Sequence, residues 1–257
     1  MLRILSVAYL SLFAAVAVWA ELPDDLPQHT IRRAAGPIVI DGKLDEASWQ
    51  AAQVIDNFVF PWWKEGEKQR TEAFLLWDAT NLYVAFIAHD KHISGHLTQR
   101  DQGVSRDDCV EAFIAPDSSD VKIYFNFEFN VLGTILDRSP RDQRSSKWNA
   151  EGIDVKISID GTLNNHEDID KKWTTEIAIP FSSFAPYAPR LPPQDGDVWR
   201  LNLYRIGGKV NPQYSQWSNT GTPKPKYHVP ERFGIVHFSG DTVAAVSAPA
   251  VQAGDAE

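Results

Sequence analysis

The sequence predicts an all-β protein, an antiparallel β-sandwich of about ten strands with one short helix. Short segments in which apolar and polar residues alternate recur along the 257 residues, as in strands that turn one face to a core. Turn-forming residues separate these segments at short intervals. A single segment has a convincing helical pattern, so helices do not alternate with the strands and a parallel α/β sheet is excluded. A closed barrel is the second choice.

Residues 1–20 are predicted to be a secretory signal peptide. Arg3 gives a basic start, residues 4–19 are almost entirely apolar, and Val18-Trp19-Ala20 ends the stretch. A membrane anchor is the alternative, but about sixteen apolar residues are short for a bilayer span. We therefore expect a secreted or periplasmic protein, cleaved near Ala20/Glu21, that does not contact a membrane afterwards.

The remaining chain divides into a polar leader at 21–36, a sandwich at 37–240 and an unpatterned tail at 241–257 that is expected to be disordered. The first elements are a strand at 37–41 and a short helix with Asp45 as its N-cap. Strands at 71–77 and 82–89 follow, joined by a tight-turn sequence. Later strands are expected at 153–159, 173–179, 198–206, 215–218 and 233–238.

A hairpin at 107–130 is predicted at the centre of the sandwich. Its first strand is apolar on both faces except at Glu111, a carboxylate that needs a partner if it is buried. Its second strand places Phe residues on one face and a polar row on the other: Tyr124, Asn126, Glu128 and Asn130. This polar row and Glu111 are the first place to look for a ligand.

Composition excludes several classes of function. The net charge of −9 and the absence of a Lys/Arg cluster argue against nucleic acid and anionic membranes as partners. Cys109 is the only cysteine, so the fold has no internal disulfide and depends on its core, in which Trp49, Trp77, Trp173 and Trp199 are expected. We expect a monomer.

No nucleophile elbow, phosphate-binding loop, dinucleotide fingerprint or Cys-x-x-Cys pair is present. His89, His92 and His96 have a metal-like spacing, but they occupy a polar loop, where histidines are common. The loop aspartates Asp101, Asp107 and Asp108 suit a structural calcium equally well. We therefore expect no cofactor; a structural calcium or a metal at these histidines is the alternative, and no metal ligand is assigned.

Aromatic residues outside the strand patterns suggest sugar binding, because sugar C–H faces stack on rings while polar side chains bind the hydroxyls. These residues are Trp62, Trp63, Trp148, Trp217 and Tyr227, although about half of them are expected only to cap the sandwich. Glu111 and Glu128 could alternatively form the carboxylate pair of a glycosidase.

Five motifs occur in an order that resembles the family 9 carbohydrate-binding modules and their relatives: residues 40–49, 76–78 with 82–84, 107–111, 173–180 and 230–234. The resemblance extends from about residue 37 to residue 238 and implies a sugar-binding β-sandwich. In the xylanase-attached members two tryptophans hold the end of a glycan. The resemblance places Glu111 at the family's Glu and Tyr227 at one Trp, and it places the other Trp near Ser105. Glu128 stands at the Arg position, Tyr204 at the Gln position, and the Asn position is near Lys224.

The same sandwich occurs in haem-binding redox domains of the DOMON/cytochrome-like superfamily, which use a Met ligand. The only Met here is Met1, so that ligation is not expected.

The sequence thus predicts an exported, non-catalytic domain that recognises poly- or oligosaccharide and supports carbohydrate catabolism. The alternatives are a glycan hydrolase using Glu111 and Glu128, and a structural or partner-binding sandwich. The predicted ligand-binding residues are Glu111, Glu128, Asn130, Tyr204, Arg205, Trp217, Tyr227 and Trp148.

Overall fold

The computed structural model describes residues 25–142, 147–208 and 210–244. The predicted signal peptide and residues 245–257 of the predicted tail lie outside these ranges. Within them the protein is all-β, as predicted. Its eleven described strands are β1 (Gln28–Arg33), β2 (Thr71–Trp77), β3 (Asn81–His89), β4 (Cys109–Ala115), β5 (Phe125–Asn130), β6 (Ile135–Arg138), β7 (Asp154–Asp160), β8 (Lys172–Pro180), β9 (Val198–Ile206), β10 (Tyr214–Gln216) and β11 (Gly234–Thr242).

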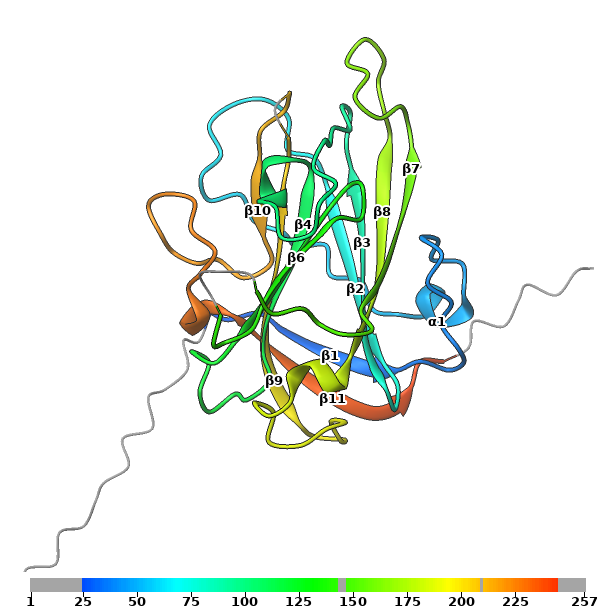
Figure 1. Ribbon diagram of the computed structural model, residues 1–257, viewed down its shortest axis with the longest axis vertical. Coiled ribbons are helices and arrows are strands. Elements are labelled where there is room, and N and C mark those ends of the chain that lie inside the picture. Colours follow the sequence, from blue (N-terminus) through cyan, green and yellow to red (C-terminus); the bar gives the residue numbers. More distant parts are fainter. Residues whose placement is uncertain (1–24, 143–146, 209, 245–257) are drawn as a thin grey trace, which may run out of the picture.

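The strands form one curled sheet in the order β6-β5-β4-β9-β11-β1-β2-β3-β8-β7, with β10 paired to β9 (Figure 1). The curl brings the β6-β5-β4-β9 half face to face with the β2-β3-β8-β7 half, which gives the sandwich-like shape. Neighbouring strands are antiparallel except at β1, which pairs parallel with both β11 and β2. The strand β1 therefore joins the two halves.

The placement of the first strand in the sequence analysis was wrong. The strand β1 lies inside the segment expected to be a leader, whereas no strand forms at 37–41. In β1 only His29 and Ile31 are buried, and Ile31 is its single apolar residue, so the segment has no hydrophobic alternation to detect. Parallel pairing on both sides supplies the backbone hydrogen bonds that fix it as a strand.

The core lies between the two halves of the sheet, and it contains the side chains that alternation predicted. Trp77, Trp173 and Trp199 are buried there with Phe125 and Phe127 of the central hairpin. At about 25 cal/mol per Å² of apolar surface, a ring system that buries roughly 150–250 Å² contributes about 4–6 kcal/mol before entropy costs. Cys109 is buried and free, as expected for a fold without a disulfide.

A second, smaller cluster attaches α1 (Ala47–Gln50) to the outside of the sheet. The buried carboxylate of Glu176 on β8 accepts hydrogen bonds from the backbone N–H groups of Asp41 and Gly42 and from Nε1 of Trp49, each at 2.9 Å. Position 42 requires glycine because its φ is +88° and a Cβ would lie 2.9 Å from the Ile157 carbonyl carbon. The sequence motifs at residues 40–49 and 173–180 are thus joined by the carboxylate of Glu176.

The boundaries of two elements differ from expectation. The helix α1 is a single turn whose N-cap is Glu46 rather than Asp45. At the other end, β11 continues to Thr242 and Val243 is buried, so the fold extends past the boundary predicted at residue 240. The remaining helices are one-turn 3₁₀ segments: η1 (Val104–Arg106), η2 (Phe181–Phe184) and η3 (Pro230–Arg232). In the described ranges, no helix has the length and apolar character needed to cross a membrane.

Candidate functional site

The outer face of β5, β4 and β9 carries a row of buried polar side chains. Glu111 on β4 lies directly opposite Glu128 on β5 and opposite Tyr204 on β9. Residues that are opposite each other in a sheet point to the same face, so the three side chains are neighbours. The pairing of β4 with β5 is the predicted hairpin, and the register adds β9 on the other side of β4.

The segment between β10 and β11 covers this face. The ring of Tyr227 stacks on that of Tyr204, with centroids 4.1 Å apart and an interplanar angle of 17°. The Tyr227 hydroxyl donates to the Arg205 carbonyl at 3.1 Å, and the Tyr204 hydroxyl donates to the Tyr227 carbonyl at 2.9 Å. Trp62, from the loop before β2, contacts Tyr227 with ring centroids 5.9 Å apart. Tyr227 is therefore a buried, fixed wall and not a freely exposed platform.

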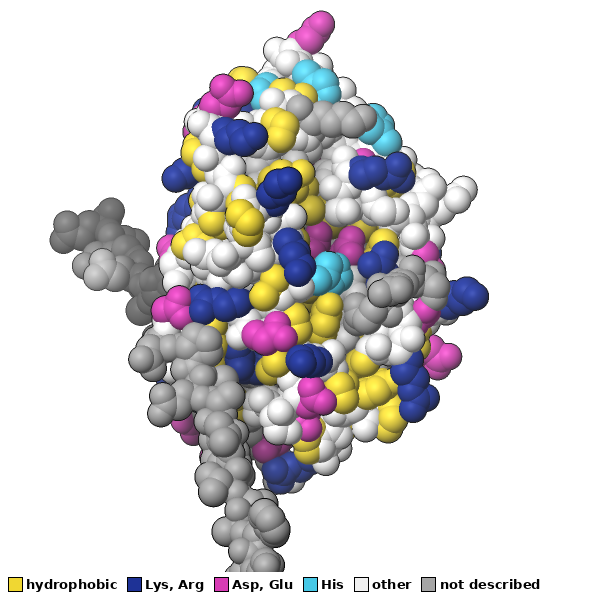
Figure 2. All heavy atoms as spheres, turned by 90° about the vertical axis from the view of Figure 1, so that its left-hand side faces the viewer, with side chains coloured by type: hydrophobic (Ala, Val, Ile, Leu, Met, Phe, Trp, Pro, Cys, Tyr) yellow, Lys and Arg dark blue, Asp and Glu magenta, His cyan; other side chains and the backbone are white. Residues whose placement is uncertain are grey.

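A cavity of about 320 Å³ opens beside these rings. Figure 2 shows a hollow on this side of the molecule in which acidic and histidine side chains gather. The carboxylates of Glu111 and Glu128 line the cavity, and Tyr227 and His228 form part of its wall. Its full lining is Ser105, Glu111, Phe113, Glu128, Ile206, Tyr214, Pro225, Lys226, Tyr227 and His228.

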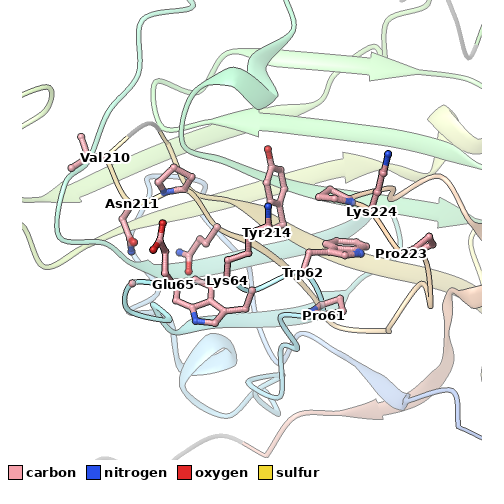
Figure 3. A pocket seen from close by; sticks show the side chains of 14 residues that line it. Pro61, Trp62, Lys64, Glu65, Val210, Asn211, Tyr214, Pro223 and Lys224 are labelled. Carbon is pink, nitrogen blue, oxygen red and sulfur yellow. The ribbon is translucent and has the colours of Figure 1, made fainter.

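A wider cleft of about 940 Å³ lies next to the cavity (Figure 3). Tyr214 and Pro225 line both, so the two spaces adjoin. The indole Nε1 of Trp62 donates to the Thr222 carbonyl at 2.6 Å, which ties the two loops on either side of the cleft together. The cleft is lined by residues 61–66, 210–214 and 223–225.

Burial sets the protonation of the carboxylate pair. It raises the pKa of Glu111 well above its usual value, and the neighbouring Glu128 charge adds to the rise. Burial also raises the pKa of Glu128 to about 7, although the Arg138 charge and a 3.0 Å hydrogen bond from Asn126 Nδ2 oppose that rise. Near neutral pH the pair therefore retains a proton and can both donate and accept hydrogen bonds.

Glu111 differs from Glu128 in its hydrogen bonding. Within the described residues, no protein group donates a hydrogen bond to the Glu111 carboxyl, although its side chain is almost fully buried. A buried polar group without a partner costs about 1–3 kcal/mol. Because Glu111 lines an open cavity, a ligand hydroxyl can supply the missing hydrogen bond.

The edge of the cavity is fixed by His228. Its Nδ1 lies 2.8 Å from the Tyr124 hydroxyl, and its ring packs against Phe113 with centroids 4.8 Å apart. Burial of the inner side of the ring lowers the pKa of His228, with a smaller contribution from the Arg138 charge. The imidazole is therefore neutral at neutral pH.

The structure separates four of the eight predicted site residues from the cavity. Arg205 points into the interior, where it forms a buried 2.8 Å ion pair with Asp90. Trp148 packs on Phe125 on the core face, and Trp217 is buried in the core. Asn130 is on the outer face, but all its bonds are internal: its Oδ1 accepts the N–H groups of residues 132 and 134, and its Nδ2 donates to residues 97 and 107.

Of the other four, Glu111, Glu128 and Tyr227 line the cavity, and Tyr204 supports it from beneath Tyr227. Residues that were not on the predicted list complete the site. Trp62 is the main one, and the feature of the sequence that could have identified it is the Trp62-Trp63 pair in a loop. Ser105, where the family resemblance lacked its second ring, also lines the cavity.

The histidines with metal-like spacing do not form a common site. His89 pairs with Glu72 at 3.2 Å, while the ring of His92 contacts that of His166. Asp107 and Asp108 accept hydrogen bonds from loop backbone N–H groups. In the described part of the chain, no three His, Cys, Asp or Glu side chains gather in a way that could hold a metal ion. A structural calcium stays a prediction without assigned ligands.

Comparison with known proteins gives a consistent set of matches. The family model described as carbohydrate-binding family 9 matches residues 59–238. No curated protein sequence matches the chain.

Solved structures share the fold at low sequence identity. A candidate carbohydrate-binding protein from Bacteroides uniformis ATCC 8492 superposes with a TM-score of 0.63 and 20% identity, over 83% of this chain and all (100%) of that one. A family 9 carbohydrate-binding module from Caldicellulosiruptor kristjanssonii in complex with cellotriose gives 0.57 and 15%, over 86% and 99%. The same kind of module from that organism in complex with glucose gives 0.57 and 15%, over 85% and 100%.

Proposed function

Because the chain belongs to carbohydrate-binding family 9, we propose that it is an exported, non-catalytic domain that binds a poly- or oligosaccharide in the Glu111/Glu128 cavity and the adjoining cleft. In this proposal it holds the glycan for enzymes that degrade it. The family assignment and the fold shared with modules in complex with cellotriose and glucose support a sugar as the ligand.

The observation that carries the proposal is the Glu111 carboxyl. It is buried, it has no hydrogen-bond donor among the residues that the structure describes, and it lines an open cavity with aromatic walls. A sugar hydroxyl that donates to it would satisfy the group. Because burial favours the protonated form of this carboxyl, the range for a neutral hydrogen bond applies, about 0.5–1.5 kcal/mol.

Trp62 is the stacking surface in this proposal. Its ring is half-buried against Tyr227, and its indole N–H is already bonded to the Thr222 carbonyl. A ring held in this way loses little further freedom when a ligand arrives, so more of the contact energy appears as affinity. Tyr227, which the sequence analysis gave this role, instead positions Trp62.

The test is a glycan array with the purified protein, followed by calorimetric titration of the best ligand. Trp62→Ala should weaken binding roughly 5- to 100-fold, the effect of losing one aromatic anchor. Glu111→Gln should weaken binding roughly 2- to 10-fold, the effect of losing one neutral hydrogen bond. Matched controls are Phe74→Ala, on the outer face of β2, and Glu167→Gln in the β7–β8 loop, and both should bind as the wild type does. If the Trp62 and Glu111 variants bind like the controls, the site is elsewhere.

One observation favours a second function, glycan hydrolysis. Opposite residues of antiparallel strands have Cβ atoms about 4.5–5.5 Å apart, and retaining glycosidases hold their carboxyl groups about 5 Å apart. Glu111 and Glu128 are directly opposite each other on adjacent antiparallel strands, and burial raises both of their pKa values. Release of reducing ends by the pure wild type, lost in both Glu111→Gln and Glu128→Gln, would replace the binding proposal with the hydrolytic one.

A further inference from the structure

The rim of the cavity and cleft is basic, although the whole chain has a net charge of −9. Lys64 and Lys224 line the cleft, and Lys226 lines the cavity. All three side chains are exposed, and they come from two loops that Trp62 ties together. Figure 3 labels Lys64 and Lys224 at the cleft, and Figure 2 shows basic side chains around the hollow.

These three lysines have no carboxylate partner among the described residues. The lysine ion pairs found there use other residues: Lys43, Lys91, Lys156 and Lys171. Nearby, the Lys68 ammonium lies 5.7 Å from the ring centroid of Phe60 and 6.0 Å from that of Trp63. The charge of the rim is therefore available to a ligand.

Negative charge inside the site does not cancel that of the rim. Glu65 is the acidic residue among those that line the cleft. Burial keeps Glu111 and Glu128 largely protonated in mildly acidic solution, and Arg138 is close enough to lower the pKa of both. A ligand that enters the site below pH 7 thus meets more positive than negative charge.

We propose that the ligand is an acidic glycan, whose carboxylate or sulfate groups lie against Lys64, Lys224 and Lys226 while one sugar unit enters the Glu111/Glu128 cavity. This inference depends on the proposed function. The two spaces together exceed the roughly 300–1,000 Å³ of a site for a drug-sized ligand, so the site has room for several linked sugar units. Exposed lysines can turn toward anionic groups at irregular spacing along a chain.

The test uses calorimetric titration at pH 6 with three probes: an oligogalacturonate, its fully methyl-esterified neutral form, and a sulfated oligosaccharide. The acid and its ester have the same sugar backbone and differ in the charge of each unit and in one methyl group per unit. The acid should bind at least tenfold more tightly than the ester, and raising the salt from 50 to 300 mM should reduce that preference. The sulfated probe shows whether the rim also accepts sulfate or requires carboxylate.

The variant Lys64→Gln/Lys224→Gln/Lys226→Gln should lose roughly tenfold or more in affinity for the acid, since each exposed ion pair contributes up to about a fivefold effect. Its affinity for the neutral ester should stay unchanged. A thermal melt should be unchanged as well, because the three side chains are exposed.

A matched control replaces three lysines of the β7–β8 hairpin, far from the site in the sheet order: Lys156→Gln/Lys171→Gln/Lys172→Gln. It should keep the full preference for acid. The inference is overturned if the wild type binds ester and acid equally, or if both triple variants lose affinity to the same degree. Binding of neutral glycans that depends on Glu111 without any preference for acid would overturn the inference alone. Failure of every neutral and acidic glycan to bind would overturn the proposed function itself.

Discussion

Replacing Glu128 with glutamine should change how the stability of the fold depends on pH. Burial raises the pKa of Glu128 from 4.5 to about 7. Between these pH values the folded protein binds more protons than the unfolded chain, so the free energy of unfolding falls as pH rises. The loss is complete above pH 7. At about 1.4 kcal/mol per pH unit it amounts to about 3 kcal/mol, with little reduction by solvent because the side chain is buried.

Glu128→Gln removes this titration and leaves an uncharged side chain of the same shape. The variant should be more stable than the wild type at pH 8, by up to about 3 kcal/mol, and the advantage should vanish near pH 5. Glu111 lies on the same face of the sheet, and the Glu128 charge raises its pKa. Part of the pH dependence of stability therefore comes from Glu111 and remains in the single variant. Glu111→Gln/Glu128→Gln should therefore show the largest difference.

The stability of the wild type as a function of pH does not test this prediction by itself, because the titration of His29 changes stability in the opposite direction. Burial lowers the pKa of His29 from 6.5 to about 4, so below pH 6.5 the unfolded chain binds the additional proton and stability falls as pH falls. The difference between wild type and variant cancels this contribution.

The assay is urea unfolding followed by tryptophan fluorescence at pH values from 5 to 8. Glu167→Gln, an exposed substitution in the β7–β8 loop, is the control and should follow the wild type at every pH. A stability difference between wild type and Glu128→Gln that stays constant with pH would refute the reasoning. In that case the carboxyl pair would not be buried as described.

Three further predictions follow from the packing. Trp199→Ala should destabilise the fold by about 3–5 kcal/mol in urea unfolding, because its ring fills the core; a smaller loss would mean that the core collapses around the gap. Glu176→Gln should lower the free energy of unfolding by about 1–3 kcal/mol, because an amide nitrogen cannot accept the hydrogen bond from Trp49. Limited proteolysis of this variant should then cut first near α1, and cleavage elsewhere would show that Glu176 does not hold α1 to the sheet. Arg205→Met should cost about 3–5 kcal/mol because it leaves Asp90 buried without its partner, and a melt close to wild type would contradict the buried pair.

Alternation predicted much of the sheet, and it located the Glu111/Glu128 pair, because side chains on a two-sided surface follow a period of two. The same alternation also indicated that one of the predicted site residues, Arg205, is not on the face of the site. In β9, alternation places Arg205 on the face of Leu203, which is the core face. Its charge suggested a ligand site instead. The partner that makes burial acceptable, Asp90, is 115 residues away in sequence, and no local pattern indicates such a pair.

The residues that line the cavity and the adjoining cleft were less predictable. Trp62, His228 and Tyr214 come from loops or a short edge strand, and their positions depend on contacts between segments distant in sequence. The hydrogen bond from Trp62 to the Thr222 carbonyl, for instance, spans 160 residues. The family resemblance pointed to Glu111 and to a position near Ser105, and both residues line the cavity, but it supplied no aromatic ring at Ser105. In the proposed site the stacking ring, that of Trp62, comes from another part of the chain.

The pairing of β1 with β11 determines when this protein can finish folding. A hydrogen bond between the Gln28 and His237 side chains joins residues 209 apart in sequence, and β1 otherwise has only a short pairing with β2. Such non-local contacts form slowly, because the long intervening chain must be closed into a loop first. The strand β1 can pair with β11 only when the chain as far as β11 is present. We therefore expect the two halves of the sheet to join late in folding, so that until then the hydrophobic faces of both halves are accessible to chaperones, to proteases and to aggregation.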